Sequence, residues 1–251
     1  MDPAVTALAE QQAETNSLLA GLATGDWARP TRCEGWTIAD VVLHLAQSDE
    51  MAVASVRGAF PTREQSSVTG WGGGSSVDES VALMVERERG ATASDLLARW
   101  STAADHLTGL LKDMDLSTRV RWVAGYLSAR TLATTRLSET WIHTGDVAAA
   151  VGIVPPATDR LRLIARLAWR TLPYAFDHDG ATLSGPVAFR LTSPSGEQWE
   201  FMPERAAVTT ISGPATELCE VAARRMDPSA TSLTGEGPDV ARVLALVRTY
   251  A

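Results

Sequence analysis

The sequence predicts an α+β protein that is mainly α-helical, with a four-helix bundle and one extra helix followed by a small α+β C-terminal domain. Two observations support this. Apolar residues recur at helical spacing through residues 1–180, and after Asp179-Gly180 they alternate with polar residues as in strands. Apolar residues make up 45% and charged residues 21% of the 251 residues, which is ordinary for a soluble globular protein. We therefore expect a helical domain over 1–180 and an α+β domain over 181–251.

Five helices are expected in the first domain from the spacing of their apolar residues. The second opens on Thr37, which stands three residues before Asp40 and has the spacing of a helix cap. Its apolar face leaves His44 at the edge of the core, and the third helix has a possible break at Gly90. The expected ranges are 3–22, 37–57, 78–112, 128–152 and 158–176.

Residues 58–77 separate the second and third expected helices. Glycine and serine cluster there around Trp71, which favours an irregular segment. Two interpretations stay open at this point: a mobile flap, or a linker with Trp71 packed against the bundle.

The second domain is expected to begin with a β-hairpin. Residues 187–192 and 197–201 alternate in polarity around the turn sequence Ser193-Pro-Ser-Gly196. The remaining expected elements are a strand at 207–212, a helix at 213–225, a short strand at 232–234 and a closing helix at 238–250.

Charge and cysteine content exclude several classes of partner and site. A net charge of −8 and a pI near 5.0 argue against nucleic-acid or anionic-membrane partners, which require a concentrated basic surface. No segment has the pattern of a signal peptide or a membrane span, so a cytoplasmic location is expected. Cys33 and Cys219 are the only cysteines and form no CxxC motif, so a bound metal would be held mostly by nitrogen and oxygen.

A candidate metal site comes from three residues on two expected helices. Glu139 and His143 are four positions apart, so their side chains lie one helical turn apart on the same face. Two ligands rarely hold a metal alone, and His44 on the second expected helix can supply the third. Catalytic zinc commonly takes three ligands of these types and leaves a position open for water or substrate. The alternative is a pair of histidines that only pack in the core.

Two motifs surround these residues and resemble a known family. They are Cys33-Glu-Gly-Trp-Thr-Ile-Ala-Asp-Val-Val-Leu-His44 and the segment from Ser128-Ala-Arg130 through Glu139-Thr-Trp-Ile-His143 to Asp146. In type and order they resemble the mycothiol-dependent maleylpyruvate isomerase family, within the DinB-like group of metal-binding four-helix bundles. The resemblance covers most of residues 3–155 and extends more weakly to the C-terminal domain. It implies that a metal, usually zinc, is held by His44, Glu139 and His143.

Other residues have weaker assignments. Asp146 lies one turn beyond His143 and is expected either to orient a ligand imidazole or only to solubilise the helix end. Arg136 and Arg130 precede Glu139 by one and about two turns and are expected to bind a carboxylate, unless they pair with nearby surface acids. Arg224 and Arg225 are candidates to contact an anionic substrate or the thiol cofactor. Cys33 either approaches the metal or packs as a small apolar residue.

The function implied by the resemblance is thiol chemistry on a small electrophile. Zinc with an open position stabilises a thiolate, and the implied thiol is mycothiol, which would attack an activated carbon. The enzyme would be an isomerase if the thiol leaves again and an S-transferase if the conjugate is the product. The metal itself is not fixed by the sequence, because sites of this kind accept several divalent ions.

Four other functions stay open. A site with two histidines and one carboxylate is also typical of non-haem iron oxygenases, and a zinc site can activate water in a hydrolase. A biosynthetic lyase or cyclase could use the same scaffold, and a non-catalytic module could hold the metal for structure alone.

Overall fold

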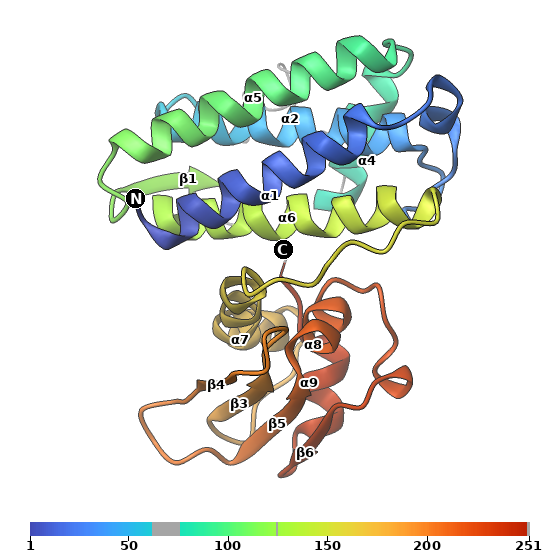
Figure 1. Ribbon diagram of the computed structural model, residues 1–251. Helices are drawn as coiled ribbons and strands as arrows, with labels where there is room; N and C mark the ends of the chain where they lie inside the picture. Colours follow the sequence, from blue (N-terminus) through green and yellow to red (C-terminus); the bar gives the residue numbers. More distant parts are fainter. Residues whose placement is uncertain (62–75, 124, 250–251) are drawn as a thin grey trace. The chain divides into compact units, whose positions relative to one another are not determined.

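The computed structural model describes residues 1–61, 76–123 and 125–249 and divides the chain into two compact units, Met1–Pro155 and Pro156–Ala251 (Figure 1). The expected flap or linker around Trp71 falls largely on residues outside the described ranges. The mainly helical α+β class expected from the sequence is confirmed.

Four long helices build the first unit, and α2 shows why its sequence folds this way. The hydroxyl of Thr37 accepts the backbone N–H of Asp40, and the Asp40 carboxylate accepts the backbone N–H of Thr37, which forms the capping box expected at this helix start. These helices pack in pairs around an apolar core: α1 with α6, α2 with α5, α1 with α5, and α2 with α6. Their bounds are α1 Pro3–Ala20, α2 Ile38–Val56, α5 Ala93–Asp113 and α6 Ala129–Ala150.

The expected third helix is two helices with a break at the expected glycine. The helix α4 spans Val77–Glu88, and Gly90 follows with a φ of 103°, a conformation that glycine adopts without strain. A new cap at Thr92 then starts α5. Hence α4 is a separate helix, and its fully buried Val85 belongs to the same apolar core as residues of α2 and α5.

A short β-hairpin between α5 and α6 has no counterpart in the sequence prediction. Strand β1, Arg119–Trp122, pairs antiparallel with β2, Gly125–Ser128. Val120 and Trp122 are buried, so the alternation of Arg-Val-Arg-Trp was the available signal. The signal is weak because each strand of the hairpin is only four residues long.

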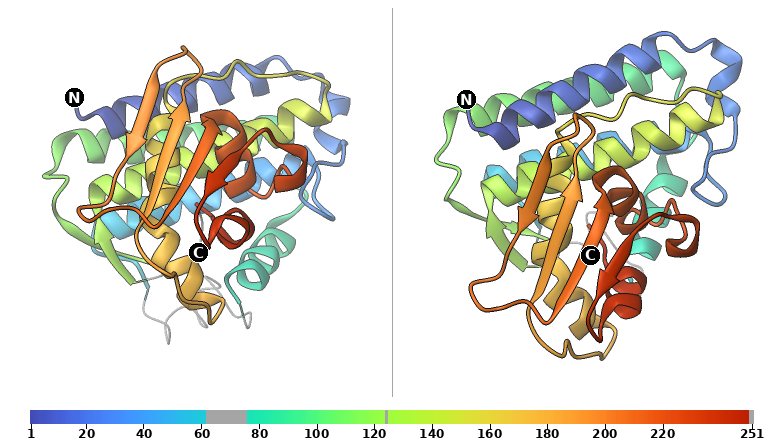
Figure 2. Two further views of the ribbon diagram at one scale, coloured as in Figure 1. Left: turned by 90° about the horizontal axis from the view of Figure 1, so that it is seen from below. Right: turned by 60° about the horizontal axis from the view of Figure 1, so that its bottom comes forward.

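The second unit is a four-stranded sheet packed against helices (Figure 2). The strand order is β4-β3-β5-β6, in which β3 and β5 are parallel and the other pairs are antiparallel. Alternate residues of β3, such as Phe189 and Leu191, are buried, whereas Arg190 is exposed and pairs with Glu200. The elements are α7 Leu161–His178, β3 Val187–Thr192, β4 Gln198–Phe201, β5 Thr209–Pro214, α8 Ala215–Ala222, β6 Thr234–Glu236 and α9 Val240–Leu246.

The division between the units lies at Pro155 and Pro156, whereas the sequence placed it near residue 180. The difference is α7, which belongs to the second unit. Its Trp169 donates from Nε1 to the carbonyl of Val187 on β3 at 2.7 Å, and Thr171 donates to the carbonyl of Arg248 at 2.9 Å. Helical periodicity reveals that α7 has an apolar face but not which domain covers it.

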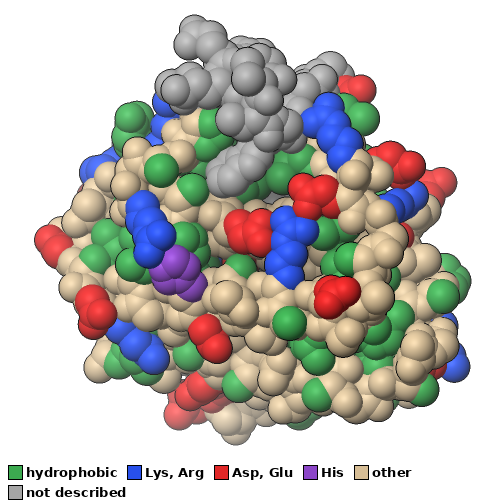
Figure 3. Space-filling view, turned by 90° about the horizontal axis from the view of Figure 1, so that it is seen from above, with side chains coloured by type: hydrophobic (Ala, Val, Ile, Leu, Met, Phe, Trp, Pro, Cys, Tyr) green, Lys and Arg blue, Asp and Glu red, His purple; other side chains and the backbone are tan. Residues whose placement is uncertain are grey.

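Surface charges of opposite sign are interspersed on the face shown in Figure 3. Among the pairs that join helices, Arg99 of α5 contacts Glu50 of α2 at 2.7 Å and Glu88 of α4 at 2.6 Å. Within the described residues, no helix has both the length and the apolar character required to cross a bilayer.

Candidate metal centre

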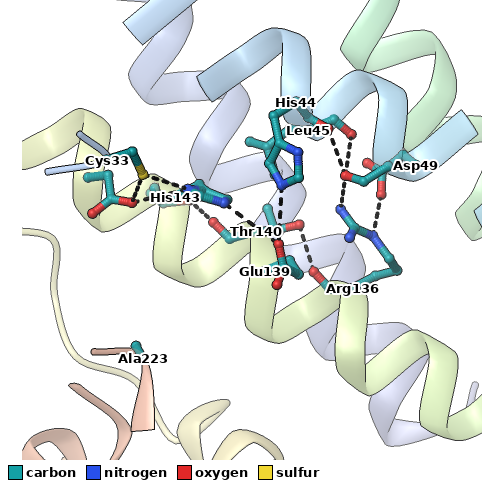
Figure 4. A network of polar contacts seen from close by, with 12 residues as sticks. Cys33, His44, Leu45, Asp49, Arg136, Glu139, Thr140, His143 and Ala223 are labelled. Atoms are coloured by element: carbon teal, nitrogen blue, oxygen red, sulfur yellow. Dashed lines mark hydrogen bonds and ion pairs between the residues drawn. The ribbon is translucent and has the colours of Figure 1, made fainter. Parts of the chain in front are cut away.

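Two packed helices bring the three expected metal ligands together (Figure 4). His44 projects from α2, and Glu139 and His143 project from one face of α6. The Oε2 atom of Glu139 lies 3.4 Å from Nε2 of His44 and 3.6 Å from Nε2 of His143. The three donor atoms lie within 4.8 Å of one another.

These separations fit a shared metal ion better than direct hydrogen bonds. Donor atoms about 2.0–2.1 Å from a tetrahedral zinc ion are about 3.3–3.4 Å apart. The observed 3.4 and 3.6 Å are close to that value and exceed the usual 2.7–3.2 Å of an N–H···O bond. Two imidazoles and one carboxylate also match the ligand chemistry of catalytic zinc and leave a position for a further ligand.

Aromatic contacts surround the two histidine rings, and the Glu139 side chain is the most exposed of the three groups. The rings of His44 and His143 meet nearly at right angles with centroids 5.0 Å apart, and Trp36 packs on His44 at 5.3 Å. Both histidines are buried, whereas the side chain of Glu139 is 19% exposed. Glu139 is therefore the most exposed of the three donor groups.

Asp146 contacts the outer nitrogen of His143. Its Oδ2 lies 3.0 Å from Nδ1 of His143 and accepts a hydrogen bond from Sγ of Cys33 at 3.4 Å. A carboxylate at this position fixes the orientation and tautomer of a metal-binding imidazole. Asp146 is fully buried, so the alternative that it only solubilises the helix end is wrong.

Cys33, the Nδ1 of His143 and Asp146 form a second, overlapping group of donors. The Sγ atom of Cys33 lies 3.9 Å from Nδ1 of His143. The two groups use opposite nitrogens of the same imidazole, so a metal held by either group leaves the other nitrogen free for a hydrogen bond.

Burial and mutual contacts shift the pKa values of the three expected ligands in different directions. Burial lowers the pKa of His44, and the neighbouring His143 lowers it further. Burial opposes ionisation of Glu139, yet its polar contacts with the imidazoles of His143 and His44 hold its pKa well below the ordinary value. Burial would lower the pKa of His143, but the hydrogen bond with Asp146 and the contacts with Cys33 and Glu139 raise it well above the ordinary value.

Comparison with known proteins assigns the chain to a family. A family model described as the mycothiol maleylpyruvate isomerase N-terminal domain matches residues 8–148, which include His44, Glu139 and His143. The chain belongs to this family. The resemblance stated from the sequence motifs is thereby confirmed.

Relatives of this family member extend the comparison over both units. Two uncharacterized proteins of Mycobacterium tuberculosis, from strains CDC 1551 / Oshkosh and H37Rv, are each 31% identical over 250 residues, covering 99% of this chain and 95% of theirs. Crystal structures of the mycothiol-dependent maleylpyruvate isomerase and of its histidine-to-alanine mutant align with TM-scores of 0.60 and 0.61, at 18% identity over 95% of each chain. At that identity the structures show a shared fold.

The arginines of this family member lie elsewhere than the sequence suggested. Arg136 is 1% exposed, and it donates from Nε to Asp49 at 2.8 Å and from Nη2 to Ser48 at 2.8 Å. It is therefore not available to bind a substrate carboxylate as expected. Arg130 is exposed and pairs with Asp2 at 2.9 Å, away from the three donors.

Asp49 is the residue of this region that sequence reasoning missed. It is fully buried on α2, and burial raises its pKa while the guanidinium of Arg136 opposes that rise. An acid four residues after Leu45 and seven after Val42 falls on the apolar face of the helix, which was the available signal. A charge on such a face requires a buried partner.

Arg224 and Arg225 lie at the C-terminal end of α8 in the second unit. Arg224 follows the C-cap with a φ of 59°, the one positive φ outside glycine among the described residues. Its Nη1 donates to the carbonyl of Ala245 at 2.6 Å, and Nη1 of Arg225 donates to the carbonyl of Ala223 at 3.1 Å. The exposed side chain of Arg224 retains further donors for an anion.

Proposed function

We propose that this protein is a metal-dependent enzyme that uses mycothiol as a nucleophile toward a small electrophilic substrate, as an isomerase or an S-transferase. The observation that carries the proposal is the distance from Oε2 of Glu139 to Nε2 of His44 and to Nε2 of His143, which in both cases is about the edge length of a zinc tetrahedron, in a member of this family. Two of the solved structures with this fold are of a mycothiol-dependent maleylpyruvate isomerase, which supports the choice of thiol.

The roles of the chain's own residues follow from their contacts. His44, Glu139 and His143 would hold a divalent cation, zinc foremost. When bound, such an ion lowers the pKa of a thiol beside it, so that thiolate forms near neutral pH. Asp146 accepts a hydrogen bond from Nδ1 of His143 and keeps Nε2 directed at the site.

The reaction of the thiolate distinguishes the two enzyme classes. In an isomerase the sulfur adds to one carbon of a conjugated carbon–carbon double bond. This addition turns the double bond into a single bond, about which the substrate can rotate. After rotation the carbon–sulfur bond breaks, the double bond re-forms, and the thiol is recovered unchanged. In an S-transferase the new carbon–sulfur bond persists. Addition to an activated alkene or an epoxide ends when the resulting anion takes up a proton, substitution at a halide ends when the halide ion departs, and one thiol is consumed per turnover.

The experiment that tests the proposal measures metal content and thiol binding together. We expect about one zinc ion per chain in the wild type and heat of binding when mycothiol is added, both lost in His44→Ala and His143→Ala. The matched control is His106→Ala, because His106 lies on α5 and contacts the exposed Arg57, not the site. In a cobalt-substituted sample, mycothiol should produce a sulfur-to-cobalt charge-transfer band.

Four results would contradict the proposal. A wild type without a metal would remove its basis. Metal binding without recognition of mycothiol would mean that the protein shares the fold of its family but not the use of this thiol. Turnover without thiol would indicate a metal-dependent hydrolase or a biosynthetic lyase. Thiol binding with no turnover of any activated alkene, epoxide or halide would favour a non-catalytic module.

A further inference from the structure

The buried ion pair between Arg136 and Asp49 joins the two helices that carry the candidate metal ligands. The guanidinium Nε of Arg136 on α6 donates to Oδ1 of Asp49 on α2 at 2.8 Å, and both side chains are buried. Burying two charges costs much of what their attraction contributes, and apolar replacements of such pairs are often as stable. Stability of the bundle alone is therefore a weak reason for an ion pair at this position.

The position of the pair relative to the metal site supplies a better reason. Arg136 precedes Glu139 by three residues on α6, and Asp49 follows His44 by five residues on α2. Each partner is thus about one turn from a ligand on its own helix. A rigid contact there limits how far α2 can slide or rotate against α6.

A second chain of hydrogen bonds leads from the same guanidinium to the backbone of His44. Nη2 of Arg136 donates to the hydroxyl of Ser48 at 2.8 Å, and that hydroxyl donates to the carbonyl of His44 at 2.8 Å (Figure 4). The planar guanidinium fixes both of its contacts in one geometry, which the flexible ammonium of lysine does not do. The turn that carries His44 is therefore held by two directional contacts from α6.

We propose that Arg136 and Asp49 are positioning residues that set the separation between His44 on α2 and Glu139 on α6, and thereby the geometry of the metal centre. This inference rests on the proposed function only in requiring that the three donors bind a metal. The contacts of a metal-binding site must hold its ligands within about 0.5 Å of the working geometry. Arg136 acts through α2 and touches neither metal nor substrate.

The test replaces the pair by apolar residues and measures the metal itself. We expect the double variant Arg136→Met/Asp49→Leu to fold with a cooperative thermal transition but to bind zinc about 10–100-fold more weakly in a chelator competition, the range typical of lost supporting contacts. Its cobalt-substituted form should show a changed d–d spectrum, which reports ligand geometry rather than stability. Wild-type zinc affinity with an unchanged cobalt spectrum in the folded double variant would overturn the proposal.

A matched control uses the neighbouring ion pair on α2. Arg99 donates from Nε to Glu50 at 2.7 Å and joins α2 to α5, which carries no ligand. Arg99→Met/Glu50→Leu should keep wild-type zinc affinity and cobalt spectrum; an equal loss there would show that any loosening of α2 suffices and would overturn the specific role of Arg136.

A conservative variant keeps the test decisive if the double variant does not fold. Arg136→Lys retains a positive charge opposite Asp49 but lacks the planar guanidinium group, which in the wild type donates to Ser48 as well as to Asp49. It should weaken zinc binding several-fold and shift the cobalt spectrum; no change in either would overturn the proposal. A wild type that binds no metal would instead defeat the proposed function and this inference together, whereas metal binding without mycothiol recognition would defeat the proposed function alone.

Discussion

The Oδ2 atom of Asp146 lies 3.0 Å from Nδ1 of His143, so the imidazole of His143 is held at its outer nitrogen while Nε2 lies 3.6 Å from Glu139. The two residues are one helical turn apart on α6, and the contact is buried. A single helix therefore supplies two of the proposed ligands and the carboxylate proposed to orient one of them. Only His44 must come from another helix.

The first prediction concerns this carboxylate. Asp146→Asn keeps the shape of the side chain but removes its charge, so the tautomer and orientation of His143 are less well fixed. We expect zinc affinity to fall about 10–100-fold with the fold retained. Chelator competition measures the affinity, and Asp95→Asn, at the start of α5 away from the site, is the control. Equal affinities for Asp146→Asn and wild type would show that Asp146 does not support the ligand.

The second prediction concerns the pH dependence of metal binding. The raised pKa of His143 means that the metal-free imidazole carries a proton near neutral pH, whereas a metal ligand must be neutral. His44 has a lowered pKa and Glu139 a strongly lowered one, so neither gains or loses a proton there. Binding thus displaces one proton, and apparent zinc affinity should rise about tenfold per pH unit until the raised pKa of His143 is reached.

Titration calorimetry in buffers of different ionisation enthalpy checks the displaced proton directly. Asp146→Asn removes the group that contributes most to raising the pKa of His143, so the slope of affinity with pH should flatten in that variant. A zinc affinity that does not change between about pH 6 and 7.5 would mean that His143 is already neutral in the metal-free protein.

The third prediction separates the two overlapping donor groups. If the metal is held by His44, Glu139 and Nε2 of His143, then Cys33→Ala keeps zinc with an affinity within about threefold of wild type, while His44→Ala loses it. The cobalt-substituted wild type should show no sulfur-to-cobalt band before thiol is added. The opposite pattern, with zinc lost in Cys33→Ala and kept in His44→Ala, would assign the metal to Cys33, His143 and Asp146.

Much of this site could be predicted because its signals are local. Glu139 and His143 share a face by helical spacing alone, and Thr37 and Asp40 mark the start of the helix that carries His44. The side-by-side packing of α2 and α6, which brings His44 to the other two, is a tertiary contact; the sequence offered His44 as a candidate third ligand, and the family resemblance strengthened that prediction.

The parts that could not be predicted depend on what a side chain meets across the core. Arg136 looked free to bind a carboxylate because nothing near it in sequence shows that Asp49, on another helix, occupies its guanidinium. Likewise, the apolar face of α7 is evident from spacing, yet its packing against β3 depends on long-range contacts such as that of Trp169. In both cases the sequence shows the chemical type of the residues, but it does not show which residues they contact in the folded chain.

The strained backbone of Arg224 is the basis of the last prediction. A φ of 59° costs a side-chain-bearing residue about 1 kcal/mol or more relative to glycine, and helix ends in this conformation usually carry glycine. Arg224 stands there beside Arg225, and its side chain is exposed. We propose that the two guanidinium groups contact an anionic group of the substrate or of mycothiol.

Arg224→Gly/Arg225→Ala should separate stability from binding. Glycine relieves the strain, so the second unit should unfold at an equal or slightly higher denaturant concentration, while the affinity for mycothiol or the KM for substrate worsens about tenfold or more. Zinc content should not change, because the proposed metal ligands lie in the first unit. Arg190→Ala removes an exposed arginine of the same unit that pairs with Glu200 and should alter none of these quantities. If the double variant binds thiol and substrate as tightly as wild type, the conformation of Arg224 has no role in recognition, and an anion-binding role for both arginines is excluded.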